Sequence, residues 1–253
     1  TWHEVWGDYW YEYLGWKGFF GKFIENIASK LGKSIAVSQM TKRNLEYLGK
    51  DKDVYIIPNG IDLERVSKIA HNIEKCDIIF VGRLIKEKNV DILLKAINYV
   101  RHELCDIKCC IIGDGPEKDN LIKLVNDRRL GNNVTFFEFM EHDDVISRIK
   151  SSKILVLPSS REGFGMVVIE AFACGVPVVT TKCDRNAASE LISKETGFVV
   201  DLDIYELGDT IYKLIVNDDL QKYMSKYTMI VAQEYDWDNI VDKLICIYKE
   251  MVP

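Results

Sequence analysis

The 253-residue sequence lacks an excess of basic residues, a long apolar run and a histidine cluster. Its net charge of −6 argues against a nucleic-acid surface, which is usually basic. No apolar run reaches the length of about 20 residues that a membrane-spanning helix requires. The four histidines show no spacing typical of metal ligands, so we expect no metal site.

The sequence also lacks the cysteine pattern of a disulfide framework or a zinc cluster. It has seven cysteines, an odd number, and none of them belongs to a Cys-x-x-Cys pair. Most of them lie in apolar segments, where a free thiol packs as a small hydrophobic group. We therefore expect reduced thiols and a cytoplasmic protein. The first residues resemble neither a signal peptide nor a natural start, so we also expect a truncated or processed chain.

From Cys76 onward, apolar strands alternate with helical patterns. The expected strands are 77–81, 108–112, 134–137, 154–157, 176–180 and 198–200. Val90, Leu93, Leu94 and Ile97 recur on one face, which predicts a helix over residues 89–101. This alternation predicts an α/β fold with a doubly wound, Rossmann-like parallel sheet. Ligands of such sheets bind beyond the carboxyl ends of the strands.

The most informative segment is Ser159–Gly175, which follows the expected strand 154–157. It reads Ser-Ser-Arg-Glu-Gly-Phe-Gly-Met-Val-Val-Ile-Glu-Ala-Phe-Ala-Cys-Gly. Glu162 and Glu170 stand eight residues apart, on either side of a glycine turn that leads into a helix. A helix that begins at a glycine turn presents free backbone N–H groups to an anion. The two carboxylates add acceptors for hydroxyl groups, so the segment suits a nucleotide-sugar.

The Glu-x7-Glu spacing resembles the signature of glycosyltransferase family 4, whose members are retaining enzymes with the GT-B fold. Three other segments resemble motifs of the same family in the same order. They are Phe80–Lys88 (Gly-Arg-Leu-x-x-x-Lys), Ile112–Pro116 (Gly-x-Gly-Pro) and Ile57–Asp62 (Pro-Asn-Gly-Ile-Asp). Each motif alone is weak, but four in order over nearly the whole chain make the resemblance specific.

The resemblance implies a binding site for a UDP- or GDP-sugar that needs no metal. Arg83 and Lys88 would stabilise the charge of the leaving diphosphate. Glu170 would hold the ribose and Glu162 the transferred sugar, and His3 would reach the donor sugar in an intact protein. The implied catalytic residues are Glu162, Arg83, Lys88 and His3. The implied donor-binding residues are Gly82, Arg83, Lys88, Gly113, Gly115, Met140, Glu162, Gly163, Phe164, Gly165, Met166 and Glu170.

Plainer interpretations of these residues exist. Arg83 and Lys88 could belong to a solvated basic loop, and His3 could be a frayed terminal residue. Glu162 and Glu170 could be surface charges, although Glu170 lies between apolar residues, where a carboxylate needs partners. A glycosidase pair is disfavoured because one glutamate lies in a loop and the other more than a turn into a helix.

By the resemblance, the chain divides into four parts. Residues 1–60 would be the end of an N-terminal, acceptor-side Rossmann-like domain, and 61–75 the interdomain linker. Residues 76–235 would be the nucleotide-sugar-binding domain, and 236–253 a helix packing back towards the N-terminal part. In residues 1–60, Ser38 is expected to cap a helix from Gln39 to about Leu48. With the acceptor side incomplete, we expect weak or no activity from this chain.

The segment 6–33 is rich in aromatic residues and lysines. Such a segment can lie on a membrane surface, which would make the protein peripheral to the membrane. The favoured alternative is that these aromatics face the remainder of the N-terminal domain.

Two departures from the family pattern concern the donor pocket. Residues 184–190 lack a Gly-Gly-Pro-Glu type sequence, and Glu138 replaces a frequent glycine near the base pocket of Phe139 and Met140.

The function predicted from the sequence is a retaining transfer of a sugar from a nucleotide-diphosphate sugar to a glycan, lipid-linked or small-molecule acceptor, without nucleic-acid partners. The alternatives are a nucleotide-sugar epimerase on the same fold and a non-catalytic nucleotide-sugar-binding module. An epimerase would form product from the donor alone.

Overall fold

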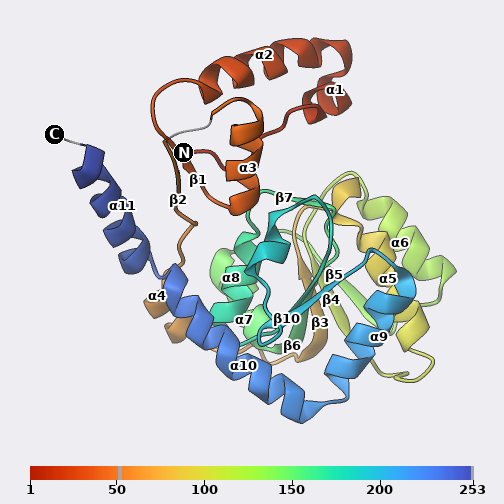
Figure 1. Ribbon diagram of the computed structural model, residues 1–253. Helices are drawn as coiled ribbons and strands as arrows, with labels where there is room; N and C mark the ends of the chain where they lie inside the picture. Colours follow the sequence, from red (N-terminus) through yellow and green to blue (C-terminus); the bar gives the residue numbers. More distant parts are fainter. Residues whose placement is uncertain (51–52, 252–253) are drawn as a thin grey trace.

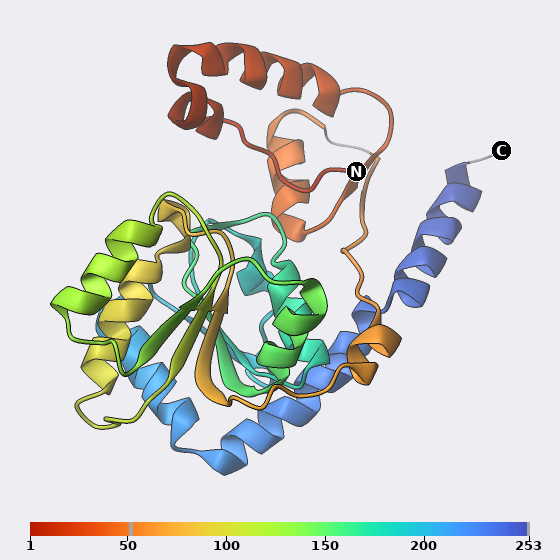
Figure 2. The same ribbon diagram turned by 180° about the vertical axis from the view of Figure 1, so that it is seen from behind.

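The computed structural model describes residues 1–50 and 53–251 (Figures 1 and 2). Its centre is a six-stranded parallel sheet with the strand order β10-β8-β6-β3-β4-β5. The strands are β3 (Cys76–Val81), β4 (Cys109–Ile112), β5 (Val134–Phe137), β6 (Ser152–Leu157), β8 (Val178–Thr181) and β10 (Gly197–Val200). The predicted α/β fold with a parallel sheet is confirmed, and the strands begin and end within two residues of the expected positions.

The central strands are apolar because helices cover both of their faces. Ile78 and Ile79 of β3 are fully buried, as is the run Ile154–Leu157 of β6. In the pairing register, Ile79 lies opposite Cys110 on one side and Leu155 on the other. This hydrophobic core fixes the strand ends, and with them the loops that follow each strand.

Helices pack on both faces of the sheet (Figures 1 and 2). One layer consists of α5 (Val90–Val100), α6 (Lys118–Asp127) and α9 (Ile204–Ile215). The other contains α7 (His142–Lys150) and α8 (Met166–Ala173), and α10 (Asp218–Ala232) packs against α8. The α5 helix buries Val90, Leu93, Leu94 and Ile97, the residues whose spacing predicted it.

Residues 1–50 and 53–60 form a smaller layer above the carboxyl ends of the large sheet (Figure 1). The strands β1 (Ser34–Ala36) and β2 (Val54–Ile56) pair in parallel, and Trp2 forms a bridge with Ala36. The α-helices of this layer are α1 (Tyr9–Leu14), α2 (Gly18–Ser29) and α3 (Gln39–Tyr47); α3 packs against both strands, and α1 packs against α2. The Ser38 side chain accepts a hydrogen bond from the Thr41 amide, which confirms the predicted cap of α3.

Two connections cross between the layers near Ile61. The segment before α4 (Leu63–Lys68) meets the segment before α11 (Trp237–Met251). The Ile61 amide donates to the Tyr235 carbonyl at 2.8 Å, and the Trp237 amide donates to the Ile61 carbonyl at 3.1 Å. From this crossing, α11 runs toward the side of the molecule where α2 and α3 lie (Figures 1 and 2).

Candidate functional site

The loops that follow β3 and β4 pack backbone against backbone. The Gly82 amide donates to the Ile112 carbonyl at 3.0 Å. A Cβ atom at Gly113, which has φ of 149°, would lie 1.9 Å from the Gly82 carbonyl oxygen. A side chain therefore cannot fit at Gly113 while both loops keep their places. The two glycines bring the β3 and β4 loops into direct contact at the carboxyl edge of the sheet.

The same contact positions Arg83. Next to it, the Leu84 amide donates to the Asp114 carbonyl at 2.9 Å, and a Cβ at Gly115 would lie 2.4 Å from the Leu84 carbonyl oxygen. The Arg83 side chain is exposed and makes no ion pair with any residue that the structure describes. A fixed backbone with an unpaired guanidinium group suits the binding of an anionic ligand.

Lys88 and Glu162 form an ion pair between the loops after β3 and β6. Their side chains are only 15% and 13% exposed, and the Ser159 hydroxyl also donates to the Glu162 carboxylate at 2.9 Å. Lys88 ends the short helix η2 (Lys86–Lys88), and Glu162 ends the two-residue strand β7 (Arg161–Glu162). The structure therefore joins two of the four predicted catalytic residues in direct contact.

Hydrogen bonds to main-chain carbonyl groups hold these two loops together. The Ser160 amide donates to the Glu87 carbonyl at 2.8 Å, and the Asn89 side-chain amide donates to the Pro158 carbonyl at 3.0 Å. Asn89 adopts a left-handed conformation with φ of 48°, which asparagine tolerates better than most residues. This turn orients Lys88 toward Glu162.

The glycine turn before α8 leaves backbone donors free. Gly165 is left-handed, with φ of 97°, and precedes the first residue of the helix, Met166. The amides of Phe164, Gly165 and Met166 have no acceptor among the described residues. Phe164 is buried and packs near Tyr235, whereas Met166 is partly exposed. Free amides at the start of a helix favour an anion.

Glu170 pairs with a residue that the sequence analysis did not single out. The His142 Nε2 atom lies 3.0 Å from the Glu170 Oε1 atom, and the Glu170 side chain is 14% exposed. Glu170 makes no ion pair with Arg83 or Lys88. His142 begins α7, just after the loop that follows β5. Its position after a strand end was the signal that could have identified it.

The loop after β5 differs from the family pattern at Glu138. Lys118 of α6 forms ion pairs with Glu138 at 3.2 Å and with Asp114 at 3.7 Å. Glu138, which stands where the family often has a glycine, thus shares Lys118 with Asp114, and this links the β5 loop to the β4 loop. Phe139 is 87% exposed, and Met140 is half-buried against the core.

His3 lies close to the glycine turn through its backbone. A Cβ at Gly163 would lie 2.4 Å from the His3 carbonyl oxygen. The His3 side chain is exposed and makes no hydrogen bond within residues 1–50 or 53–251. The catalytic role expected for His3 stays a prediction.

The segment 184–190, which departs from the family pattern, makes hydrogen bonds to Thr181 and to two residues of α3. The Asn186 side-chain amide donates to the Thr181 carbonyl at 2.7 Å. The Glu190 carboxylate accepts from Arg43 at 2.6 Å and from the Met40 amide at 3.2 Å, so the segment binds α3 of the smaller layer.

A second junction between the layers includes Arg161. Its Nε atom donates to Glu4 at 2.6 Å, and its guanidinium carbon lies 3.3 Å from the centre of the Tyr9 ring. The Tyr9 hydroxyl donates to Glu87 at 2.7 Å, and this hydrogen bond raises the pKa of Tyr9. Arg161 and Glu4 are 157 residues apart in the chain, and Tyr9 and Glu87 are 78 apart, so no local pattern could reveal these pairs.

Tyr9→Phe should lower the free energy of unfolding by about 1 kcal/mol, because it removes the hydrogen bond to Glu87 but keeps the ring. Urea unfolding measures this change. Tyr212→Phe is the matched control, since the Tyr212 hydroxyl makes no hydrogen bond with a described residue and should have no effect. A Tyr9→Phe protein as stable as the wild type would contradict this contribution.

Two further observations describe the chain. No group of three His, Cys, Asp or Glu residues within the described ranges could hold a metal ion. None of the helices in the described part is both long and apolar enough to cross a bilayer.

Comparison with known proteins identifies the family. Residues 63–245 match the family described as "Glycosyl transferases group 1", and residues 1–65 match "Glycosyltransferase Family 4". The chain belongs to the glycosyl transferases group 1 family. The first match covers more than half of the chain, including both halves of the Lys88–Glu162 pair.

Individual curated proteins share about 30% sequence identity with this chain. The chain is 28% identical to an uncharacterized glycosyltransferase of Haemophilus influenzae, over 95% of this chain and 68% of that protein. It is 31% identical to the alpha-D-kanosaminyltransferase of Streptomyces kanamyceticus, over 69% of this chain and 45% of that protein. The chain thus spans about half to two thirds of the length of these curated relatives.

A solved structure of the pneumococcal O-GlcNAc transferase, in complex with UDP and GlcNAc, shares the fold. Its TM-score is 0.75 at 20% identity, over 89% of this chain and 46% of that one. This likeness confirms the predicted GT-B type fold.

Proposed function

We propose that this chain carries the donor site of a retaining glycosyltransferase that uses a nucleotide-diphosphate sugar and needs no metal. The observation that carries the proposal is the Lys88–Glu162 pair, which lies at the strand ends between the exposed Arg83 loop and the glycine turn. A cationic group and a sugar-facing carboxylate are thereby held next to each other. Membership of the glycosyl transferases group 1 family supports the same assignment.

Each residue has a role in the proposed site. Arg83, Lys88 and the free amides of the glycine turn bind the diphosphate, and their fixed positive charge stabilises it as it leaves. Glu162 accepts hydrogen bonds from the transferred sugar, and Glu170, oriented by His142, accepts them from the ribose. His3 contacts the donor sugar. The half-buried Met140 lies beside the nucleotide base, which is uracil or guanine.

The proposed reaction needs no nucleophile from the protein. The acceptor hydroxyl oxygen bonds to the anomeric carbon, and the bond from that carbon to the diphosphate oxygen breaks. The bonding electron pair leaves with the diphosphate, and the acceptor proton passes to the departing phosphate oxygen. Attack and departure occur on the same face of the sugar, so the anomeric configuration is kept. The acceptor is a glycan, a lipid-linked sugar or a small molecule.

The domain division is also a proposal. Residues 1–60 form the acceptor side, 61–75 the linker and 76–235 the donor side, while 236–253 return towards the first part. The crossing at Ile61 and Trp237 supports this division, because both connections between the layers lie there.

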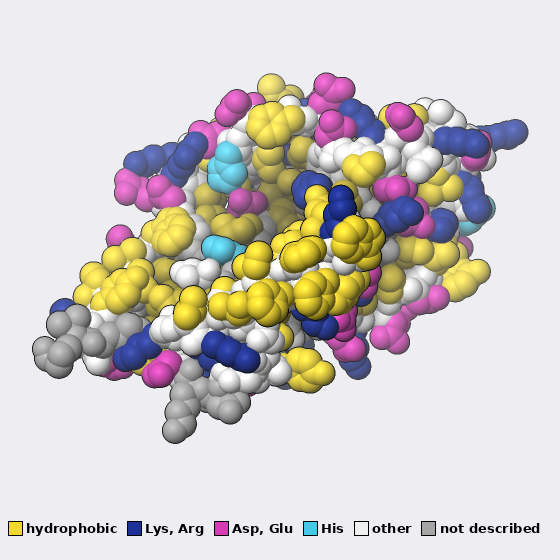
Figure 3. All heavy atoms as spheres, turned by 90° about the horizontal axis from the view of Figure 1, so that it is seen from above, with side chains coloured by type: hydrophobic (Ala, Val, Ile, Leu, Met, Phe, Trp, Pro, Cys, Tyr) yellow, Lys and Arg dark blue, Asp and Glu magenta, His cyan; other side chains and the backbone are white. Residues whose placement is uncertain are grey.

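The exposed face of α1 and α2 is an apolar surface to which we assign a contact. Large apolar side chains form a band over these two helices (Figure 3). They include Tyr13, Trp16, Phe19, Phe20, Phe23, Ile24, Ile27 and Leu31. We propose that this band packs against the remainder of the N-terminal domain, as the sequence analysis favoured. Membrane contact through it predicts cosedimentation with vesicles that contain an anionic lipid, and the absence of cosedimentation supports the protein contact.

The stereochemistry of the product tests the proposed mechanism. Proton NMR of the product formed from a UDP- or GDP-α-sugar should show an α-glycosidic linkage, with no β-anomer. A β-linked product would exclude retention. Conversion of the donor alone, without acceptor, would instead support an epimerase.

A further inference from the structure

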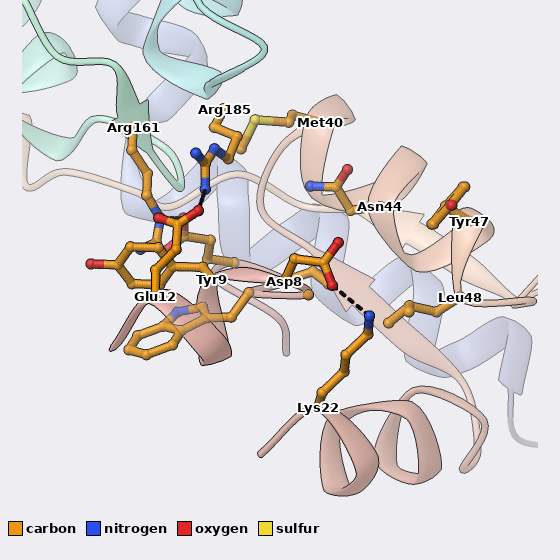
Figure 4. Close-up of a pocket in the computed structure, with 14 residues that line it drawn as sticks. Asp8, Tyr9, Glu12, Lys22, Met40, Asn44, Tyr47, Leu48, Arg161 and Arg185 are labelled. Atoms are coloured by element: carbon orange, nitrogen blue, oxygen red, sulfur yellow. Dashed lines mark hydrogen bonds and ion pairs between the residues drawn. The ribbon is translucent and has the colours of Figure 1, made fainter. Parts of the chain in front are cut away.

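A pocket lies beside the proposed donor site, between the smaller layer and the strands β7 and β9 (Arg185–Asn186) (Figure 4). Its volume is about 400 Å³. Its walls come from the segment that begins at Glu4, from α1, α2 and α3, and from the two arginines of the short sheet. None of the residues proposed for the donor site lines it.

The pocket and the donor site share the strand β7. Successive side chains of a strand point to opposite faces. Arg161 accordingly lines the pocket, whereas its neighbour Glu162 pairs with Lys88. Tyr9 of the pocket wall makes a hydrogen bond to Glu87, the residue before Lys88. The two sites are therefore adjacent: Arg161 lines the pocket and the next residue, Glu162, belongs to the donor site.

The charges of the pocket wall neutralise one another. The wall contains three basic and three acidic side chains, and each basic one has an acidic partner. Arg161 pairs with Glu4 at 2.6 Å, Lys22 with Asp8 at 2.5 Å, and Arg185 with Glu12 at 3.4 Å (Figure 4). A phosphate or carboxylate on a ligand would have to compete with these acids. The wall therefore favours an uncharged ligand.

The remaining groups suit a ring that carries hydroxyl groups. The Asn44 side-chain amide lines the pocket and makes no hydrogen bond with any described residue (Figure 4). An amide offers both donors and acceptors to hydroxyl groups. Trp6 and Tyr9 add aromatic surface, and Met40 and Leu48 add apolar surface. Pockets with apolar walls and a few polar groups are typical of sites for small molecules.

We propose that this pocket binds the acceptor of the transferase, and that the bound part of the acceptor is an uncharged sugar unit. The inference rests on the proposed function, because an acceptor must lie beside the donor. It goes further in assigning a place and a chemical class: a neutral pyranoside in contact with Asn44 is accepted, and a phosphorylated or acidic sugar is disfavoured.

Ligand-observed NMR on the full chain tests this assignment. The probes are the methyl α- and β-glycosides of glucose, galactose, mannose and N-acetylglucosamine, with glucose 6-phosphate and glucuronate as charged counterparts. At least one neutral glycoside should bind with a millimolar dissociation constant and at least fivefold more tightly than either charged sugar. Asn44→Ala should weaken this binding at least fivefold, and Asn126→Ala, an exposed asparagine of α6, should leave it unchanged.

A charge variant provides a second test. Glu12→Gln frees Arg185 from its partner and should raise the affinity for glucose 6-phosphate several-fold, without doing so for the neutral glycoside. The proposal is overturned if no neutral glycoside binds, if Asn44→Ala binds as well as wild type, or if the charged sugars bind more tightly to wild type. UDP and GDP binding to Asn44→Ala is measured in parallel. Retained nucleotide binding with lost glycoside binding separates the two sites, and a chain that binds no nucleotide refutes the proposed function alone.

Discussion

Gly113→Ala should lower the free energy of unfolding by about 3 kcal/mol, the sum of a strained backbone and an overpacked contact. The new Cβ would lie 1.9 Å from the Gly82 carbonyl oxygen, a backbone atom that cannot turn away. In addition, φ of 149° at this position is unfavourable for any residue with a side chain. The β3 and β4 loops would separate, and the Arg83 loop would lose its support.

Thermal unfolding measures this effect. For a chain of this size, about 3 kcal/mol corresponds to a lowering of Tm by roughly 6–12 °C. Gly131→Ala is the matched control, because no atom lies within 4 Å of its Cβ position and its φ is not in the positive range. The control should be neutral or slightly stabilising. A Gly113→Ala protein with the Tm of the control would show that the two loops do not pack as described.

Lys88→Ala should remove most of the stabilisation that a bound nucleotide gives. It deletes one proposed phosphate contact and leaves the Glu162 carboxylate, which is 13% exposed, without its cationic partner. The unpaired carboxylate would then repel the diphosphate, so both changes act in the same direction. The loss of charge-assisted hydrogen bonds predicts an affinity lower by about 1.5–3 kcal/mol, which is roughly 10- to 150-fold.

Titration calorimetry with UDP and GDP measures the change in affinity. Lys86→Ala is the matched control, since Lys86 lies in the same short helix, is exposed and pairs with no described acidic residue. The control should bind like the wild type. Equal losses in both variants would point to a general effect of charge and against a specific role of Lys88.

The sequence predicted the fold well because its signals are local. Apolar runs such as Ile154–Leu157 are buried on both faces of the sheet, and the spacing of Val90, Leu93 and Ile97 matches one face of α5. The cap at Ser38 likewise depends on a residue only three positions away. Such signals are contained in short windows of sequence, and they set the carboxyl edge of the sheet as the place of the site.

The candidate site was predictable only in part. The motif residues Lys88 and Glu162 do meet, but the partner of Glu170 is His142, on a helix that carries no motif. Arg161 lies within the most informative segment, yet its partners Glu4 and Tyr9 come from the start of the chain. Pairs between distant segments depend on how the two layers pack together, and no local pattern contains that information.

The most direct test of the donor site is a thermal-shift panel of UDP, GDP and ADP with their common sugar conjugates. The panel is run on wild type, on Arg83→Ala and, as a control, on Arg128→Ala, which changes an exposed arginine just after α6. At about 100 times its dissociation constant, one nucleotide family should stabilise the wild type and the control by roughly 2.7 kcal/mol. The Arg83→Ala protein should show little of this stabilisation. Equal stabilisation of all three proteins, or of none of them, would contradict a donor site at Arg83.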